Sequence, residues 1–351
     1  MSAMRKLPWR KRRGLQPKPP GGKTGVIRNV IVLPKLAANK LMRRRRLKKA
    51  GIVSGQHGEI AESVPSVTAM ASAGAATTRR APQRLRWVLP SDGPVCSAGN
   101  LEVYITRDRD AIRAAQALRY TVFYDEMGAR PSPVARRLRL DMDRYDDICD
   151  HLIVVDRGMD DGEQIVGAYR LLRGSVARDN GGFYSADEYD LTPLMEQPIE
   201  QLLELGRSCV AATHRSKSTI QLLWRGIAAY LAEHELTTLF GCASFHGRDP
   251  QAHAESLSYL RHFHAAEPEK AVKALPERHV DMEMVPKDEI DARRVWKAMP
   301  PLIKAYLRLG GVIGDGAVVD DQFGTIDVFV TVAMDQVGSR YYAHFDKRTD
   351  G

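Results

Sequence analysis

At 351 residues, the chain is long enough for one large domain or two small ones, and its 44% of hydrophobic residues supply a sizeable core. No apolar run approaches the roughly 18 to 20 residues of a membrane-spanning helix, and four scattered cysteines without CxxC spacing favour reduced thiols over a disulfide framework. The net charge of +9 is uneven, because residues 1–50 hold 17 Lys and Arg and no Asp or Glu. The other residues hold 35 basic and 43 acidic side chains, a balance of −8, so the sequence predicts an acidic body with a basic arm.

Residues 1–95 are expected to form this arm, basic and largely disordered, because they lack sustained apolar periodicity. A short amphipathic helix around VIRNVIVLPKLAANKLMRRRRLKK would suit an anionic surface, so we expect residues 1–50 to contact the inner face of a membrane peripherally. A plain solvated tail and an organelle transit peptide are the alternatives, and the basic start lacks the clean apolar core of a secretory signal. Nucleic-acid binding is disfavoured, since the body carries no matching basic motif.

Residues 96–351 have the pattern of a globular domain in which strands and helices are mixed, an α/β (α+β) class with more strand pairs than a βαβ alternation gives. We expect strands where apolar residues alternate or run together, and helices where they recur every three or four positions. The expected strands are 101–106, 151–156, 164–172, 202–211, 236–245 and a hairpin at 316–335, and the expected helices are 110–127, 218–235, 252–263 and 300–311.

Charged residues stand inside several of these apolar patterns. Arg119 is on the buried face of the first helix, Arg170 has apolar residues on both sides of its strand, and Glu204 and Arg207 lie in the middle of a hydrophobic strand. Glu204 and Arg207 are three apart and would face opposite ways in a regular strand, so Gly206 suggests a β-bulge that brings both to one cleft. Buried ions need partners, and a buried cluster of them is more often functional than not.

The segment DMDRYDDICDHL at 141–152 is the expected source of these partners, together with Glu204. As an EF-hand it fails, because Asp146 stands at the Gly position and Leu152 at the bidentate Glu position. Cys149 and His151 lack a second pair for zinc. The sequence therefore predicts an electrostatic site without a metal, in which Asp141, Asp143 and Asp146 organise the three arginines.

Several motifs in this order resemble known acyltransferases. Arg119-x-x-x-Phe123, DMDRYD, AYRLL with Arg170 and ELGR at 204–207 look like the acyl-homoserine-lactone synthases, which depend on acyl carrier protein and have the GNAT N-acetyltransferase fold. YDDICDHL, FYSADEYDL, LELGRSCV, LLWRGIAAYL, LFGCASFHGRDP and PPLIKAYLRLGG are similar to the sister family of L-ornithine Nα-acyltransferases. The resemblance runs from about residue 100 to about residue 345 and leaves the arm outside.

The resemblance implies a GNAT-like acyl-CoA N-acyltransferase fold, with a mixed, mostly antiparallel sheet, splayed central strands and flanking helices. It implies cytoplasmic transfer of a 3-hydroxyacyl group from acyl carrier protein to the α-amino group of L-ornithine, giving lyso-ornithine lipid. The co-substrate is then the phosphopantetheine thioester, with no bound cofactor. The turn THRSKSTIQ departs from the GNAT R-x-x-G-x-G/A pattern, because Ser218 and Ile220 replace glycines, which suits a single phosphate.

Roles follow from this implied reaction. Glu204 is expected to be the general base, and Tyr259, on the following helix, to protonate the leaving thiolate. The acyl-pantetheine arm is expected to contact Val210, Ala211, Arg215, Ser218 and Thr219, with a backbone N–H near Val210 or Ala211 holding the oxyanion. The aspartates would also attract the two amines of ornithine, and one of the arginines would bind its carboxylate.

Three alternatives stay open. An enzyme of the same fold acylates another amino acid, such as glycine or lysine, or makes an acyl-homoserine lactone, although VFYDEMGAR lacks the tryptophan that lactone synthases usually carry. A non-enzymatic protein acts instead through the arm, on membrane or nucleic acid. Removing residues 1–95 separates catalysis from such binding.

Overall fold

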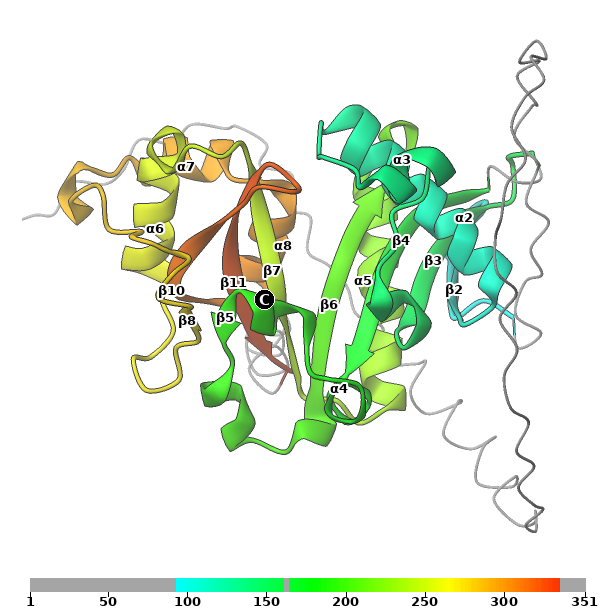
Figure 1. The fold of residues 1–351 in the computed structure, drawn as a ribbon, viewed down its shortest axis with the longest axis horizontal. Helices are drawn as coiled ribbons and strands as arrows, with labels where there is room; N and C mark the ends of the chain where they lie inside the picture. Colours follow the sequence, from blue (N-terminus) through cyan, green and yellow to red (C-terminus); the bar gives the residue numbers. More distant parts are fainter. Residues whose placement is uncertain (1–92, 161–163, 335–351) are drawn as a thin grey trace, which may run out of the picture. The chain divides into compact units, whose positions relative to one another are not determined.

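The computed structural model of the chain describes residues 93–160 and 164–334. The basic arm, its predicted amphipathic helix and almost all of the predicted segment 1–95 lie outside the described residues. The extended sheet runs through the described part, with helices on both of its faces (Figure 1).

The sheet has eleven strands in the order β1-β2-β3-β4-β6-β7-β11-β10-β8-β5, and β9 pairs with β10. Most neighbours are antiparallel, as the family resemblance implied; β6 and β7, and the short pair β8 and β10, are parallel. The strands are β1 (Cys96–Ala98), β2 (Leu101–Thr106), β3 (Asp150–Asp156), β4 (Ile165–Arg173), β5 (Tyr189–Asp190), β6 (Leu202–Val210), β7 (Thr238–His246), β8 (Lys273–Ala274), β9 (His279–Val280), β10 (Val312–Asp320) and β11 (Thr325–Ala333).

Seven α-helices accompany the sheet among the described residues. The helices are α2 (Arg109–Tyr120), α3 (Pro133–Leu138), α4 (Gly174–Asp179), α5 (Lys217–Glu233), α6 (Ala254–His264), α7 (Ala292–Ala298) and α8 (Pro301–Arg308). Helix α2 begins at the N-cap Asp108, which accepts from Ala111 N–H, and it continues as a π-helical turn over Thr121–Glu126.

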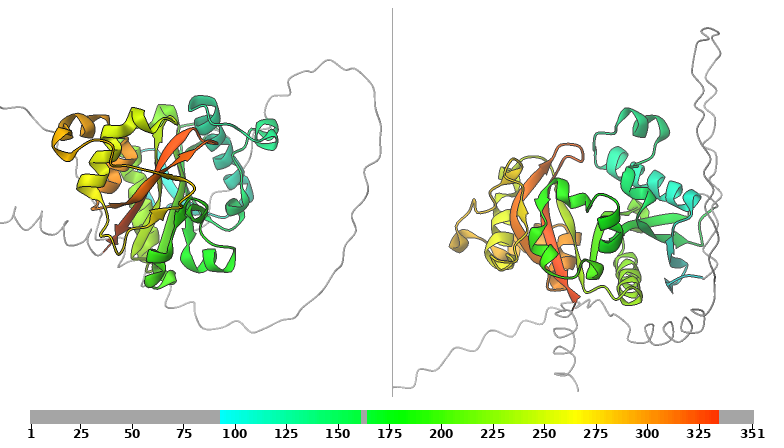
Figure 2. Two further views of the ribbon diagram at one scale, coloured as in Figure 1. Left: turned by 60° about the vertical axis from the view of Figure 1, so that its left-hand side comes forward. Right: turned by 60° about the horizontal axis from the view of Figure 1, so that its bottom comes forward.

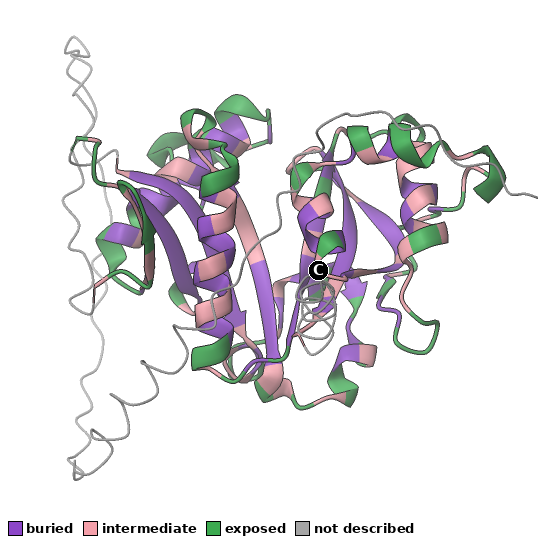
Figure 3. Ribbon diagram, turned by 180° about the vertical axis from the view of Figure 1, so that it is seen from behind, coloured by how far each residue is buried: buried purple, intermediate pink, exposed green. Residues whose placement is uncertain are grey.

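Helices α2 and α5 cover opposite faces of the sheet (Figures 1 and 3). Helix α2 packs on β4 and β6, whereas α5 packs on β1, β2 and β3. The close approach of α5 depends on Gly226, since a Cβ there would lie 2.7 Å from Val103 Cγ1 and 2.9 Å from Leu152 Cδ1. These contacts hold α5 close against β2 and β3.

Strands β6 and β7 separate soon after they meet. Their parallel pairing covers three rungs, from Leu202↔Thr238 to Glu204↔Phe240, after which the two strands diverge (Figure 1). Gly241 stands at the point of divergence, where a Cβ would lie 2.4 Å from the carbonyl oxygen of Leu205. The predicted splay of the central strands is therefore present.

The hairpin β10–β11 continues the sheet beyond β7 (Figure 2). An aromatic cluster of Phe183, Tyr189, Phe240 and Phe329 packs the segment 183–191 against β7 and β11. Tyr189 also donates its hydroxyl to the backbone carbonyl of Asp327. This packing holds the segment over the opening between β6 and β7.

Candidate active site

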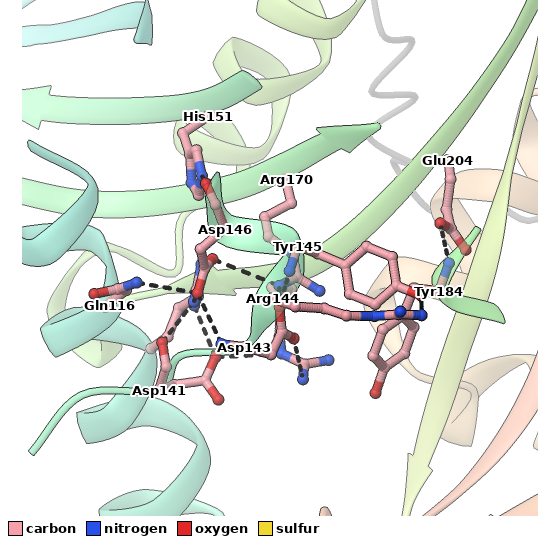
Figure 4. Close-up of polar contacts among 12 residues, drawn as sticks. Gln116, Asp141, Asp143, Arg144, Tyr145, Asp146, His151, Arg170, Tyr184 and Glu204 are labelled. Carbon is pink, nitrogen blue, oxygen red and sulfur yellow. Dashed lines mark hydrogen bonds and ion pairs between the residues drawn. The ribbon is translucent and has the colours of Figure 1, made fainter. Parts of the chain in front are cut away.

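Arg119 is fixed by two aspartates of the loop that precedes β3. Its side chain is 1% exposed, and it contacts Asp141 at 2.8 Å through Nε and Asp146 at 2.8 Å through Nη2. Asp146 also accepts from the side-chain amide of Gln116 and the backbone N–H of Asp143 (Figure 4). These bonds compensate most of the cost of burying the ions; Arg119 Nη1 alone of this guanidinium has no hydrogen-bond partner among the described residues. They lower the pKa of Asp146 to about 2, against the opposing effect of its burial.

The other two arginines complete the cluster. Arg170 pairs with Asp143 and lies 3.5 Å from Asp146, and Arg207 reaches Asp141 at 3.2 Å and Asp143 at 3.0 Å. The guanidinium of Arg207 also lies between the rings of Tyr184 and Phe323, 4.8 and 4.5 Å from their centroids. The predicted pairing of the three arginines with the aspartate-rich loop is thus confirmed.

The same pairing overturns the expectation that the aspartate-rich loop presents negative charge to a substrate. Three arginines face three aspartates, so the cluster is electrically neutral. Asp141, Asp143 and Asp146 are occupied by arginines, and the negative charge expected to attract the amines of a substrate is not supplied here. His151 and Cys149 follow the loop; the ring of His151 contacts the backbone oxygen of Asp146. Burial lowers the pKa of His151 to about 4 and raises that of Cys149 to about 12.

A β-bulge turns Arg207 toward the site. Ala168 pairs with Cys209 and Arg170 with Gly206, so three residue steps of β6 oppose two of β4. The extra residue is accommodated with Arg207 in the left-handed region, at a φ of 51°. The sequence predicted a bulge at Gly206, and it lies one residue later. As expected, Glu204 and Arg207 both line one cavity.

Glu204 is buried and held by the segment 184–185 and not by an arginine. Its Oε2 accepts from Tyr184 N–H at 2.8 Å, and its Oε1 accepts from the N–H and the hydroxyl of Ser185 at 2.8 and 2.6 Å. The prediction that Glu204 neutralises an arginine is therefore wrong. Burial raises the pKa of Glu204, and the three donors oppose that rise. The carboxylate is 4% exposed and belongs to the lining of the cavity.

A cavity of about 570 Å³ opens where β6 and β7 separate. One wall is apolar and comes from α5 and α8, where Trp224 packs edge-on against Tyr306. A second part of the lining is polar, and we call it the polar wall. The apolar wall includes Ile220, Leu223, Trp224, Leu302 and Ala305, and the polar wall includes Arg170, Glu204, Arg207, Asp320, Thr325 and Asp327. Phe123 lines the cavity too, and packs edge-on against Phe323.

The end of β6 offers one backbone donor to the gap. Ala211 N–H donates to Val166 on β4 at 2.9 Å, so it is not available to a substrate, and the expectation for its N–H is wrong. Because successive N–H groups of a strand point to alternate sides, Val210 N–H points away from β4, toward the opening. Arg215 lies on that side as well, since its Nε donates to Val210 O at 3.0 Å. Arg215 also pairs with Glu126.

The predicted pantetheine contacts in the turn before α5 differ in burial and in hydrogen bonding. Ser216 is the N-cap and accepts from Thr219 N–H at 3.2 Å. Thr219 is buried under this cap, and Ser218 is exposed and bonds to the Ser216 hydroxyl. Val210 and Arg215 line the cavity; the remaining predicted pantetheine contacts, Ala211, Ser218 and Thr219, stand beside its lining.

Tyr259 lies elsewhere. It is on α6, which packs on β10, and its ring contacts Phe263 and His264. The cavity lining does not include Tyr259. The predicted role as proton donor to a leaving group is therefore corrected, because α6 covers the far part of the sheet and not the gap beside β6.

Several site residues were missed by sequence reasoning. Tyr184 and Ser185 come from FYSADEYDL, which was noted as a motif without roles, and Asp320 and Asp327 come from the hairpin. The rule that found Arg170, a charge inside an apolar strand, also applies to Asp327 in TIDVFV. The sequence of β11 therefore carries the signal that identifies Asp327 as a site residue.

Known proteins share this sequence over most of the described part. The model of the "Acetyltransferase (GNAT) domain" family matches residues 118–225. An L-ornithine N(alpha)-acyltransferase of Brucella abortus (strain 2308) is 49% identical over 250 residues, which are 70% of this chain and 89% of that protein. One of Agrobacterium fabrum (strain C58) is 45% identical over 250 residues, 70% of this chain and 85% of that protein. Among solved structures, the AHL synthase LasI aligns at a TM-score of 0.38 and 12% identity over 68% of this chain and 91% of its own.

Proposed function

The chain belongs to the L-ornithine N(alpha)-acyltransferase family and is an N-acyltransferase of the GNAT type, and from this premise we propose its reaction in full. It transfers a 3-hydroxyacyl group from acyl carrier protein to the α-amino group of L-ornithine and forms lyso-ornithine lipid. The observation that carries the proposal is the cavity between β6 and β7, which is lined by a buried carboxylate, Glu204, and by the apolar side chains of α5 and α8. An apolar wall suits an acyl chain, and a buried carboxylate suits an amine that must lose a proton.

The acyl donor enters through the opening between the strands. The phosphopantetheine arm lies along β6, and its phosphate lies near the N-terminus of α5, where free N–H groups and the helix dipole favour an anion. Arg215 stands beside this path. A single phosphate fits the turn better than the pyrophosphate of coenzyme A, since Ser218 and Ile220 occupy positions that are glycines in the GNAT pattern. The acyl carrier protein is thus the proposed partner.

Glu204 acts as the general base. It takes one proton from the ornithine ammonium, directly or through a water, and the free amine attacks the thioester carbon. Val210 N–H, directed toward the opening, donates to the oxyanion. Collapse of the tetrahedral intermediate breaks the C–S bond, and the second proton of the nitrogen passes to the departing thiolate, so no separate acid is needed. The reaction as written requires no metal and no resident cofactor.

Arg170 is the proposed partner of the ornithine carboxylate. Its Nη1 is committed to Asp143 and Asp146, whereas its Nε is buried and lacks a hydrogen-bond partner among the described residues. Arg170 lines the cavity next to Gly206. A buried unsatisfied donor costs roughly 1–3 kcal/mol, and a carboxylate would remove that cost.

Among the described residues, no helix has the length and apolar character needed to cross a membrane. We propose that the enzyme works in the cytoplasm and that residues 1–50 contact the anionic inner face of the membrane, where the lipid product is released. Residues 96–351 form the proposed catalytic domain. A chain without residues 1–95 should keep its turnover with soluble substrates and bind anionic vesicles more weakly.

The test is a reconstituted reaction. The purified chain is incubated with 3-hydroxyacyl carrier protein and L-ornithine, and the products are identified by mass spectrometry. Lyso-ornithine lipid and free carrier thiol are expected. Acyl-coenzyme A, glycine, lysine and S-adenosylmethionine replace donor or acceptor in parallel reactions. Faster turnover with coenzyme A would refute the proposed donor, and a lactone product would move the chain to the lactone synthases.

A further inference from the structure

The polar wall of the cavity carries carboxylates that the arginines do not neutralise. Asp320 ends β10, and Asp327 lies on β11 opposite Ser244 of β7. Glu188 comes from the segment that the aromatic cluster packs over β7. Oxygens of Glu188 and Asp327 and the sulfur of Cys242 lie within 4.8 Å of one another. Asp320 and Asp327 line the main cavity, and Glu188 lines a smaller adjoining one that shares Asp320.

The hydrogen-bonding capacity of this wall is not filled. Asp327 is 7% exposed and Thr325 is 4% exposed. The hydroxyls of Ser244 and Thr325 lie close enough to Asp327 to lower the pKa of its carboxyl group, but Asp327 Oδ1 and Thr325 Oγ1 make no hydrogen bond of ordinary geometry in the described part of the chain. Both residues are on β11, two positions apart, and therefore share one face of the strand. Buried oxygens without donors are costly and rare in native proteins. They mark a place where a donor from outside the chain belongs.

Cations of the protein do not fill this place. Within residues 93–160 and 164–334, Asp327 has no ion pair, and Glu188 has one, with the half-exposed Arg278 at 3.4 Å. Burial and the neighbouring carboxylates raise the pKa of Glu188 to about 7 and that of Asp327 to about 6. A cation bound between them would return both groups to the ionised state.

We infer that this wall, formed by Asp327 with Glu188, Asp320 and Thr325, is the subsite for the side-chain ammonium of the acceptor. The ligand class is an α-amino acid with a terminal alkylammonium group. The inference rests on the proposed function, and it assigns the acceptor selectivity to residues outside the arginine–aspartate cluster. A divalent metal is the weaker occupant, because the Cys242 thiol, whose pKa is raised well above its usual value by burial and by these carboxylates, is a poor ligand while protonated.

The experiment compares two acceptors that differ in one group. L-Norvaline has the carbon chain of L-ornithine without its side-chain amine, so the ratio of kcat/KM for ornithine to that for norvaline isolates recognition of that amine. In the wild-type enzyme we expect a ratio on the order of 100 or more, since a site built for a polar group rejects the analogue that lacks it. Asp327→Asn should lower the ratio by at least about 10-fold, through the loss for ornithine, with norvaline unchanged.

Two further variants serve as a control for the loss of a carboxylate and as a second test of the wall. Asp315→Asn removes a carboxylate from β10 that pairs with Arg261 outside the main cavity, and it should leave the ratio unchanged. Thr325→Val keeps the wall charge and should lower the ratio several-fold, which covers the case in which Asp327→Asn does not fold. Thermal shifts report binding without turnover. They are measured with about 10 mM ornithine or norvaline, a concentration that exceeds a dissociation constant on the order of 1 mM. Ornithine should raise the melting temperature of the wild type more than norvaline does.

The results separate the two proposals. If the wild type acylates ornithine and the folded variants Asp327→Asn and Thr325→Val keep its ornithine-to-norvaline ratio, the subsite is wrong and the proposed function stands. If the wild type acylates no ornithine, the proposed function fails first. The inference would be overturned if EDTA inactivated the wild type, zinc restored its activity, and Asp327→Asn did not respond to EDTA. The wall would then be assigned to a metal.

Discussion

Ser185 donates two hydrogen bonds to one oxygen of Glu204, from its N–H at 2.8 Å and from its hydroxyl at 2.6 Å. With both donors in place, Oε1 has little capacity left. Oε2 accepts one bond, from Tyr184 N–H, and keeps a free lone pair. The proton of an incoming ammonium is therefore expected to go to Oε2, and Ser185 sets both the orientation and the basicity of the carboxylate.

Replacing Ser185 by Ala should change the pH dependence of the reaction. The lost hydroxyl stabilised the ionised carboxylate, so the pKa of Glu204 rises further, and the acidic limb of kcat moves to higher pH. A pH profile of kcat at saturating ornithine measures the shift. Ser258→Ala is the matched control, because it removes a buried hydroxyl that donates to Met282 O away from the cavity. An unmoved limb in a folded Ser185→Ala enzyme would remove Glu204 as the titrating base.

Glu204→Gln should abolish most of the acyl transfer. The amide cannot take a proton, and loss of a general base lowers kcat by about 10²- to 10⁴-fold. The variant keeps the shape of the side chain, so circular dichroism should show a folded protein. Its melting temperature should be lower than that of the wild type, because the new NH2 group faces a backbone N–H donor and cannot accept its hydrogen bond. Glu200→Gln, an exposed glutamate paired with Arg178, is the control and should turn over normally. Wild-type kcat in Glu204→Gln would exclude the proposed base.

The arginine–aspartate cluster should contribute mainly to the stability of the fold and not to the electrostatic attraction of a substrate. Asp146→Ala leaves Arg119 and Arg170 buried without one of their partners, and breaking a buried pair in this way costs about 3 to 5 kcal/mol. Its neighbour Asp147 is exposed, and Asp147→Ala should change the free energy of unfolding by less than ~0.5 kcal/mol. Urea unfolding of both variants measures the difference. Equal stabilities would mean that the cluster is not needed for the fold.

Recognition of ornithine should strengthen as pH rises through the range from 6 to 7. An ammonium binds the ionised carboxylates, and the raised pKa values of Asp327, about 6, and Glu188, about 7, keep these groups protonated below that range. Asp320 and Arg207 also face Asp327, and Asp320 and Arg278 also face Glu188. The ornithine-to-norvaline ratio cancels effects on the α-amine and Glu204, and it should rise by up to ~10-fold per pH unit for each proton released. A ratio that is flat between pH 5.5 and 8 would contradict the subsite.

Much of the fold was accessible from the sequence, because it depends on local patterns. Apolar periodicity located the principal strands and helices, and buried charges such as Arg119 and Arg170 predicted an ion-pair cluster with the aspartate loop. Short elements with little periodicity, among them β5, β8 and β9, were missed. These strands exist because neighbours distant in the sequence pair with them.

The partners within the site were harder to predict. Glu204 is bound by Ser185, which precedes it by 19 residues and lies in the single-turn 3-10 helix Tyr184–Asp187, so no periodicity connects them. Tyr259 was assigned from the order of strand and helix, but the position of α6 depends on where the hairpin β10–β11 joins the sheet. Which of the N–H groups of Val210 and Ala211 bonds to β4 depends on the register of β6 against β4, and this register shifts at the bulge at Arg207.

The apolar side chains of the cavity and the carboxylates outside the arginine–aspartate cluster and β6 come from different elements. Helices α5 and α8 supply the apolar wall, β10 and β11 supply Asp320 and Asp327, and the segment 183–191 supplies Glu188 of the adjoining cavity. In engineering, chain-length preference and amino-acid preference should therefore be adjustable one at a time. Libraries directed at Leu223 and Leu302 would alter the lipid tail, and libraries directed at Thr325 and Asp327 would alter the head group. Combining the best members of each would then give enzymes for new amino-acid lipids with additive changes in selectivity.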